Sequence, residues 1–575
     1  MDTQRLLLFV IFSFSALFLW EAWQKEHAPV APSVAARSET KPGDLPEAGR
    51  APVATPGVPA GAAATPSPAA VPGNAAPANA AAAATPPVTI KTDLYTAEVD
   101  PVGGVITLVA LDKHRDPHDT AKPYLALQRN AERTFVAQAG VIGDGMPNHR
   151  TVYQVLPGPR ELAAGADKLD LKLQATAANG DKVVQTLTFN RGSYVIDAAF
   201  DVTNATAAPF VPEAYFQLMR DTKQAVPPTS SMAPAAFVGP VVYNDKDKFK
   251  KVDFAEIDKE TADPSRKPAY THAADNGWIG MIEHYFVAAW LPPADKPLAR
   301  QFYTNKVDGG LYTAGVRYAE GTIAPGATGE LRARLYVGPQ AQDVLGKLAP
   351  GLDLVVDYGI FTIIAAPLFW LLKWLHGLIG NWGWAIIVMT ILIKSVFYPL
   401  NHASARSMAK MKIVGPKMKA LQEQYAKDKQ QLQAKMMEMY RQEKINPLGG
   451  CLPILVQIPV FIALYWVLLS AVELRHAPWI GWIHDLSAPD PWFVLPVVYA
   501  ITAYLQVKLS PTPISDPVQA KVMQFMPIAF SVMFVFFPAG LVLYWLVNNC
   551  IQIFQQWHMN RVITGEQAAL AAKRR

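Results

Sequence analysis

Residues 382–400 read WGWAIIVMTILIKSVFYPL, an apolar stretch interrupted by a single charge, Lys394. A helix of this length rises about 28 Å, enough to cross the hydrocarbon core of a bilayer. The segment that follows, residues 401–447, carries ten lysines and arginines against four carboxylates. Because basic loops stay in the cytoplasm, these two features together predict a membrane span whose C-terminal end faces the cytoplasm.

Four more apolar stretches predict further spans: Leu448–Val472, Trp492–Leu509, Val522–Phe537 and Gly540–Trp557. If each crosses in turn, residues 473–490 lie outside, while residues 510–520 and a basic tail, 561–575, lie inside. The apolar stretch Tyr358–Ile379 is ambiguous. Only one stretch between an outer domain and the basic segment can cross, so residues 351–380 are predicted to form an amphipathic helix on the outer surface.

The N-terminal half has three predicted parts. Residues 1–27 contain an uncharged run, Leu6–Trp20, after Arg5, and no small-x-small pattern follows it directly. This favours an uncleaved signal anchor with a cytoplasmic N-terminus, and cleavage at a downstream alanine stays open as the alternative. Residues 28–87 are mostly alanine and proline, which predicts a disordered linker.

Residues 88–350 alternate apolar and polar side chains with a period of two. Leu169, Leu171 and Leu173 alternate with polar residues, Asn179-Gly180 supplies a turn, and Lys182–Phe189 predicts the returning strand. We therefore predict a large antiparallel β-sandwich outside the cytoplasm. The fold class is a multi-pass α-helical membrane protein, with an N-terminal anchor, a five-span core at 381–560 and this sandwich.

The basic segment 401–447 has a heptad-like apolar pattern, which predicts a helical hairpin on the cytoplasmic side. Its apolar positions are mostly methionines: Met408, Met411, Val414, Met418, Leu421 and Tyr425, then Leu432, Met436 and Met439. Methionine adapts to many apolar surfaces, so the stripe either contacts apolar clients or holds the two helices together.

Polar residues inside the predicted spans are the candidate functional groups. Lys394 lies about 18 Å from the outer end of its span. Gln457 and Gln552 fall at a similar depth, and Gln552 belongs to a polar helical face with spacings of three and four: Tyr544, Asn548, Asn549, Gln552, Gln555 and Gln556. These groups predict a hydrophilic recess open to the cytoplasm. The alternatives are a lysine that extends to the headgroups and a dry bundle held by amide hydrogen bonds.

Composition and motifs exclude several other classes of protein. The net charge of +5 is small for a nucleic-acid binder of 575 residues, and the two cysteines leave no disulfide framework. The sequence contains no nucleotide-binding loop, no HExxH and no GxSxG, and His114, His118, His272 and His284 have no ligand spacing. We predict neither an enzyme nor a metal or cofactor site.

Four segments resemble the YidC/Oxa/Alb family of membrane protein insertases. They are NPLGGCLPILVQIP at 446–459, VELR at 472–475, WIHDL at 482–486 and GLVLYWLVNN at 540–549. The resemblance extends over essentially the whole chain and is most specific from 357 to 557. It implies the layout of Gram-negative members: an inner-membrane insertase and chaperone with an anchor, a large periplasmic sandwich, a surface helix and a five-span core.

The resemblance also implies a client groove open to the cytoplasm and to lipid, lined by Thr390, Lys394, Gln457, Tyr544, Trp545, Asn549 and Gln552. The family usually has arginine where this chain has Lys394, so the positive charge is kept and the planar guanidinium is lost. Trp545 replaces a common tyrosine. The implied partners are nascent membrane proteins, membrane lipids, the Sec translocon, and the ribosome and signal-recognition pathway at the hairpin and tail.

Two other functions fit parts of the sequence. A small-molecule transporter would use the intramembrane polar residues as its substrate site, although no internal repeat accompanies them. A carbohydrate-active enzyme anchored by its helices would use the sandwich, and would leave the five spans unexplained.

Overall fold

The computed structural model describes residues 86–573 except 118, 225–235, 263–267, 296, 357, 359–360, 426–427, 444–451, 510–524, 527–528 and 530. The predicted anchor and almost all of the predicted linker lie outside these residues, as do His118 and six of the sixteen residues of the predicted span Val522–Phe537.

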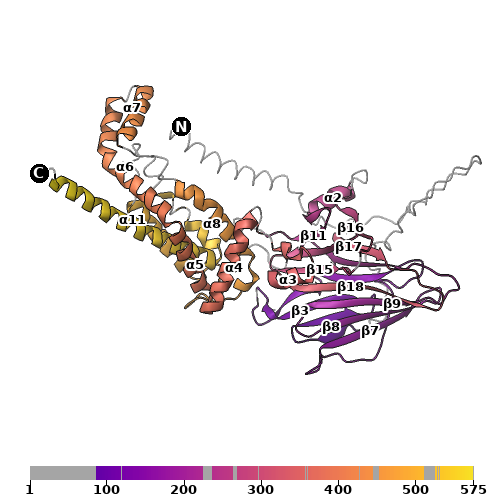
Figure 1. Cartoon of the computed structure of the whole chain (residues 1–575). Helices are drawn as coiled ribbons and strands as arrows, with labels where there is room; N and C mark the ends of the chain where they lie inside the picture. The colour runs from indigo at the N-terminus through magenta and orange to yellow at the C-terminus, as the bar shows by residue number, and fades with distance from the viewer. Residues whose placement is uncertain are drawn as a thin grey trace, which may run out of the picture. The chain divides into compact units, whose positions relative to one another are not determined.

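Residues 88–339 form two nine-stranded antiparallel sheets (Figure 1). The first sheet has the order β1 (Val88–Lys91), β2 (Tyr95–Asp100), β3 (Val105–Arg115), β4 (Pro123–Arg129), β5 (Thr134–Ile142), β10 (Glu213–Arg220), β17 (Leu311–Ala319), β16 (Arg300–Val307) and β13 (Thr271–Ala274). The second has the order β12 (Lys248–Lys251), β11 (Gly239–Asn244), β14 (Trp278–Glu283), β15 (Phe286–Leu291), β18 (Thr328–Pro339), β9 (Val195–Thr203), β8 (Lys182–Asn190), β7 (Lys168–Thr176) and β6 (Gln154–Val155).

The hairpin of β7 and β8 confirms the prediction from alternation. Its register pairs Leu169 with Phe189 and Leu171 with Leu187, and all four side chains are at most 2% exposed. Gly180 in the turn has φ of 91°, which is why the sequence needs glycine there. Each buried side chain of this kind contributes about 1.5–3 kcal/mol through removal from water, so the apolar face fixes the register.

The sandwich also contains two short helices, α2 (Phe254–Ala262) and α3 (Gln342–Leu348). The strand pattern gave no signal for either, because a helix of two turns has too few residues to establish a period.

The C-terminal part is helical (Figure 1). Its elements are η1 (Leu352–Val355), α4 (Thr362–Ile379), α5 (Trp382–Val396), α6 (Tyr398–Gln424), α7 (Lys429–Gln442), α8 (Leu452–Ser470), η4 (Val472–Leu474), α9 (Val494–Leu509), η5 (Phe534–Phe536) and α11 (Ala539–Lys573). Within the described residues, α4 alone is long and apolar enough to cross a membrane by itself, and the bent pair Trp382–Val396 with Tyr398–Ser404 would be a second span. Two shorter apolar helices are Val456–Ser470 and Val494–Leu509. The five-span count therefore stays a prediction.

Helix α4 has two unlike faces. Ala365, Phe369, Leu372 and Leu375 are at most 6% exposed, whereas the opposite face exposes Ile363, Trp370, Trp374 and Leu378. One face therefore packs on the protein, and the other is suited to lipid. Length and hydropathy would let α4 cross the bilayer, so its place on the outer surface rests on the topology argument.

Two helices end at other residues than the stretches that were predicted as spans. The stretch Trp382–Leu400 is not one helix, because α5 ends at Val396 and the chain bends by 62° before continuing in α6. Pro399, at the start of α6, has no N–H for a helical bond and its ring would clash with the preceding turn. The stretch Gly540–Trp557 is part of a 35-residue helix that continues through the predicted tail, since no proline stops it and its end is rich in alanine.

The segment 401–447 contains two helices packed side by side. Val414 and Met418 of α6 are buried with Met439 of α7, and the Tyr440 hydroxyl contacts the Met418 sulfur at 3.1 Å. Asp428 caps α7 by accepting hydrogen bonds from two backbone amides. These described apolar side chains pack between the two helices. They therefore favour the interpretation that the apolar stripe holds the helices together over the one in which it contacts clients.

Candidate functional site

Three helices meet at a chain of polar side chains. The Lys394 Nζ on α5 lies 3.2 Å from the Gln457 Oε1 on α8, and the Gln457 Nε2 donates to the Asn548 Oδ1 on α11 at 3.1 Å. Lys394 is 2% exposed and Asn548 is 8% exposed. We call this the Lys394–Gln457–Asn548 chain. It brings together groups that are 63 and 91 residues apart in the sequence.

The Lys394 ammonium has a neutral partner. The side chains it meets in this chain are amides, and within the described ranges Lys394 forms no ion pair with a carboxylate. Amide oxygens satisfy one donor of the ammonium but do not cancel its charge. A buried cation of this kind keeps an attraction for any anionic group that reaches it, because the surroundings screen the charge weakly.

The other predicted site residues lie around this chain. Asn549 donates to the Thr502 hydroxyl at 3.0 Å and so joins α11 to α9. Thr390 is 1% exposed, and its hydroxyl donates to the Ile386 carbonyl of its own helix. Gln552 is half-buried, about one turn beyond Asn548 and Asn549. The structure thus groups Lys394 with Gln457 and places Thr390 among packed side chains.

Two participants were missing from the predicted site. Asn548 was part of the polar face but was not chosen, although it accepts the hydrogen bond from Gln457. Thr502 gave a fainter signal, a single hydroxyl within the apolar stretch Val494–Leu509. Only the packing of α9 against α11 identifies it as a partner of Asn549.

Aromatic rings close the site on one side. Trp545 lies 4.4 Å from Phe461, 5.9 Å from Phe534 and 6.4 Å from Tyr499, measured between ring centroids. Tyr544 is 1% exposed and lies 6.4 Å from Phe461. The indole N–H of Trp545 is a hydrogen-bond donor, and it is buried without a partner in the described part of the chain. Trp545 therefore contributes packing between helices α8, α9 and α11.

The segment between α8 and α9 is fixed by Asp490. This carboxylate, 1% exposed, accepts hydrogen bonds from the Trp482 indole at 3.0 Å and from the Leu495 amide at 2.7 Å. Burial of Glu473 in the same segment raises the pKa of its carboxyl above the ordinary value. A buried acceptor at the start of α9 holds the first turn of that helix in place.

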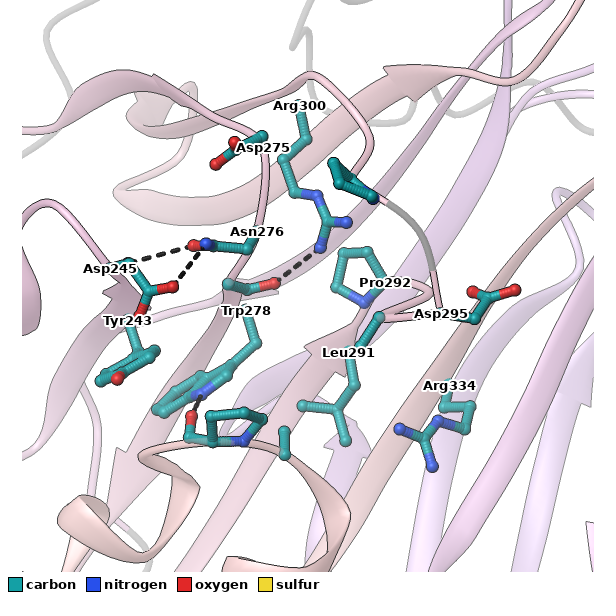
Figure 2. Close-up of a pocket in the computed structure, with 15 residues that line it drawn as sticks. Tyr243, Asp245, Asp275, Asn276, Trp278, Leu291, Pro292, Asp295, Arg300 and Arg334 are labelled. Atoms are coloured by element: carbon teal, nitrogen blue, oxygen red, sulfur yellow. Dashed lines mark hydrogen bonds between the residues drawn. The ribbon is translucent and has the colours of Figure 1, made fainter.

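The sandwich has a pocket of its own, with a volume of about 260 Å³ (Figure 2). Several of its polar groups are held in hydrogen bonds within the sandwich. Asp245 and Asn276 exchange two hydrogen bonds, and the Arg300 guanidinium donates to three backbone carbonyls. Trp278 donates to the Pro350 carbonyl at 3.0 Å. These bonds use the groups for structure, and among the described residues that line the pocket no nucleophile is paired with a base.

No cluster of three histidine, cysteine, aspartate or glutamate side chains that could hold a metal ion occurs among the residues described. Cys550 is a free, exposed thiol. His272 Nδ1 lies 2.5 Å from the Asp247 carboxylate and its side chain is half exposed, so it belongs to a surface hydrogen bond.

Apolar helices joined by buried polar side chains, together with an antiparallel sandwich, define a helical membrane protein with a large domain outside the bilayer. Two family models match the chain in agreement with this class: the YidC periplasmic domain over residues 87–371, and the 60Kd inner membrane protein over residues 374–567. The chain belongs to the YidC family of membrane protein insertases.

Full-length relatives support the assignment. The chain is 48% identical over 570 residues to a membrane protein insertase YidC of Aromatoleum aromaticum, covering 99% of each chain. It is 49% identical over 587 residues to one of Cupriavidus necator, covering both chains completely.

Among solved structures, a crystal structure of an active YidC insertase with its first transmembrane domain resolved covers 82% of this chain and 94% of its own, at 18% identity and a TM-score of 0.36. A galactose mutarotase related enzyme from Lactobacillus acidophilus covers 44% of this chain and 97% of its own, at 7% identity and a TM-score of 0.27.

Proposed function

We propose that this chain inserts proteins into the inner membrane and assists their folding there, through a client groove built around the Lys394–Gln457–Asn548 chain. The observation that carries the proposal is a buried ammonium whose partner is a neutral amide. The names of the full-length relatives support the same activity.

In this proposal the polar chain opens to receive the hydrophilic part of a client. Gln457 and Asn548 can exchange their mutual hydrogen bond for bonds to a client backbone, because amides both donate and accept. Lys394 attracts acidic client residues. The apolar part of the client leaves sideways into lipid, where burial of its side chains supplies the driving free energy. No nucleotide is needed.

The proposed topology follows from charge. Basic residues 401–447 and 561–575 lie in the cytoplasm, the sandwich lies in the periplasm and α4 lies on the outer surface with Trp370 and Trp374 in the lipid interface. Five spans, including the stretch Val522–Phe537, connect the two sides. The cytoplasmic hairpin and tail face the ribosome and the signal-recognition pathway, and the membrane core faces the Sec translocon.

Site-specific crosslinking of a stalled client tests the groove. Photo-crosslinkers at Gln457, Trp545 and Gln552 should capture the client. A crosslinker at Leu392, which is 41% exposed on the outer face of α5, is the matched control and should capture lipid.

Cysteine labelling distinguishes a wet groove from a dry bundle. With Cys451 and Cys550 replaced, single cysteines at Lys394 and Gln552 should react with a membrane-impermeant thiol reagent added from the cytoplasmic side. Unreactive cysteines, together with equal client capture at Leu392, would reject the groove and leave the family assignment intact.

A further inference from the structure

A second polar cavity lies between the first turns of α6 and the middle of α11. Its volume is about 220 Å³, equal to roughly seven water molecules of liquid volume. The lining residues are Tyr398, Asn401 and His402 from α6, with Phe554, Gln555, His558 and Met559 from α11. None of the seven is acidic, and none belongs to the Lys394–Gln457–Asn548 chain.

The cavity holds one buried donor without an acceptor, and two histidine rings lie beside it. The Asn401 Nδ2 is buried and has no hydrogen-bond partner among the described residues. An amide nitrogen donates only, so the group that satisfies it must be an acceptor. The His402 and His558 rings can each present an N–H beside it. Three donors without a carboxylate suit an anion with several oxygens, such as a phosphate.

The rim of the cavity is aromatic and exposed. Phe554 is 63% exposed and Tyr398 is 46% exposed, while Trp557, one turn before Arg561, is 40% exposed. The Trp557 ring lies 6.0 Å from the ring of Phe554, which lines the cavity, and the Arg561 guanidinium lies 4.0 Å from the centroid of the Trp557 ring, so a cation lies beside the rim. Aromatic rings beside a cation are typical of the region where a helix leaves the hydrocarbon for the headgroups.

The depth agrees with this position. Tyr398 follows the C-terminal end of α5, whose 15 residues rise about 22 Å from Trp382, and His558 lies 19 residues, about 28 Å, along α11 from Ala539. The hydrocarbon core is about 30 Å thick, so the cavity falls at one headgroup layer. In the topology above, that layer is the cytoplasmic one, which carries the anionic lipids.

We propose that this cavity binds the phosphate of an anionic phospholipid, with Asn401, His402 and His558 as donors and the acyl chains lying over Phe554 and Tyr398. The site requires that the helices cross the bilayer. It does not depend on the client groove, so loss of lipid binding and loss of insertion are separate observations.

Native mass spectrometry of the full-length protein in detergent tests the site. The wild type titrated with phosphatidylglycerol should retain one lipid more tightly than it retains phosphatidylcholine. His402→Phe and His558→Phe should each raise the dissociation constant of that lipid about tenfold, the usual effect of one lost hydrogen bond to a charged group.

Two further variants keep the test interpretable. His402→Gln preserves a donor and should stay within about threefold of the wild type, even if the phenylalanine variants fold poorly. His484→Phe, on an exposed histidine in the segment between α8 and α9, is the matched control and should bind as the wild type does.

Three results would overturn the proposal: equal retention of phosphatidylcholine, unchanged affinity in both phenylalanine variants, or displacement of the bound lipid by millimolar glycerophosphate. The last result would identify a site for a soluble phosphate instead of a lipid.

Discussion

The charge of Lys394 gives the sharpest prediction about insertion. A client carboxylate that approaches to about 4 Å of the ammonium gains an attraction of roughly 4 kcal/mol at an effective dielectric constant of about 20. Loss of water from the carboxylate offsets part of this gain. We expect a net preference of about 1.5–3 kcal/mol for an acidic client, the range found for hydrogen bonds to charged groups.

The assay compares two clients that differ by one Asp→Asn substitution in the translocated segment. Purified protein in liposomes inserts each client, and protease protection gives the two initial rates. The ratio of these rates should be about 10 to 150 for the wild type, by conversion of the expected preference. Lys394→Arg should keep the ratio, Lys394→Met should bring it near one, and Lys394→Glu should invert it.

Lys394→Met also removes the hydrogen bond to Gln457, so stability needs its own control. Gln457→Met removes the same bond, and the one to Asn548, while the charge stays. It should lower the unfolding free energy by about 1–3 kcal/mol and leave the rate ratio unchanged. An equal ratio in the wild type, Lys394→Met and Lys394→Glu would refute an electrostatic role.

Three further predictions concern other parts of the chain. Deletion of residues 28–325 should leave insertion largely intact, whereas deletion of residues 358–379 should abolish it because α4 buries one face on the helical core. Loss of insertion in the first variant, with the protein still present in the membrane, would show that the sandwich is needed for insertion. His149 lies between β5 and β6, and its ring contacts the Tyr215 hydroxyl of β10. Burial lowers the pKa of His149 to about 4, below its ordinary value of 6.5, so the folded sandwich favours the neutral ring and loses up to about 3 kcal/mol of stability as the pH falls from 6.5 to 4. Thermal unfolding of His149→Asn should depend less on pH in that range, and an unchanged pH dependence would show that His149 does not contribute to it. Ribosome binding to the basic hairpin and tail should weaken steeply with salt, and binding that resists salt would leave the charges with a role in topology alone.

The sequence by itself determined those parts of the architecture that follow from a repeating pattern of apolar residues or from local composition. The β7–β8 hairpin follows from alternating leucines and the Asn179-Gly180 turn, because one face of a strand must be buried and a tight turn needs glycine. The helical C-terminal part follows from apolar runs, since only a helix satisfies its own backbone in lipid. The polar candidates Lys394 and Gln457 followed from the high free energy of burying such groups.

Tertiary structure decided which polar groups meet. Counting residues along each span put Lys394, Gln457 and Gln552 at one depth. The rotation of each helix about its axis instead brings Asn548 to Gln457, where it completes the Lys394–Gln457–Asn548 chain, and it turns Thr390 into the packed interior. The bend at Phe397 and the continuation of α11 to Lys573 depend on one proline and on packing between helices, which a hydropathy window averages away. A hydropathy pattern fixes how deep a residue lies, whereas only packing fixes the direction in which its side chain points, and hydrogen bonds require both.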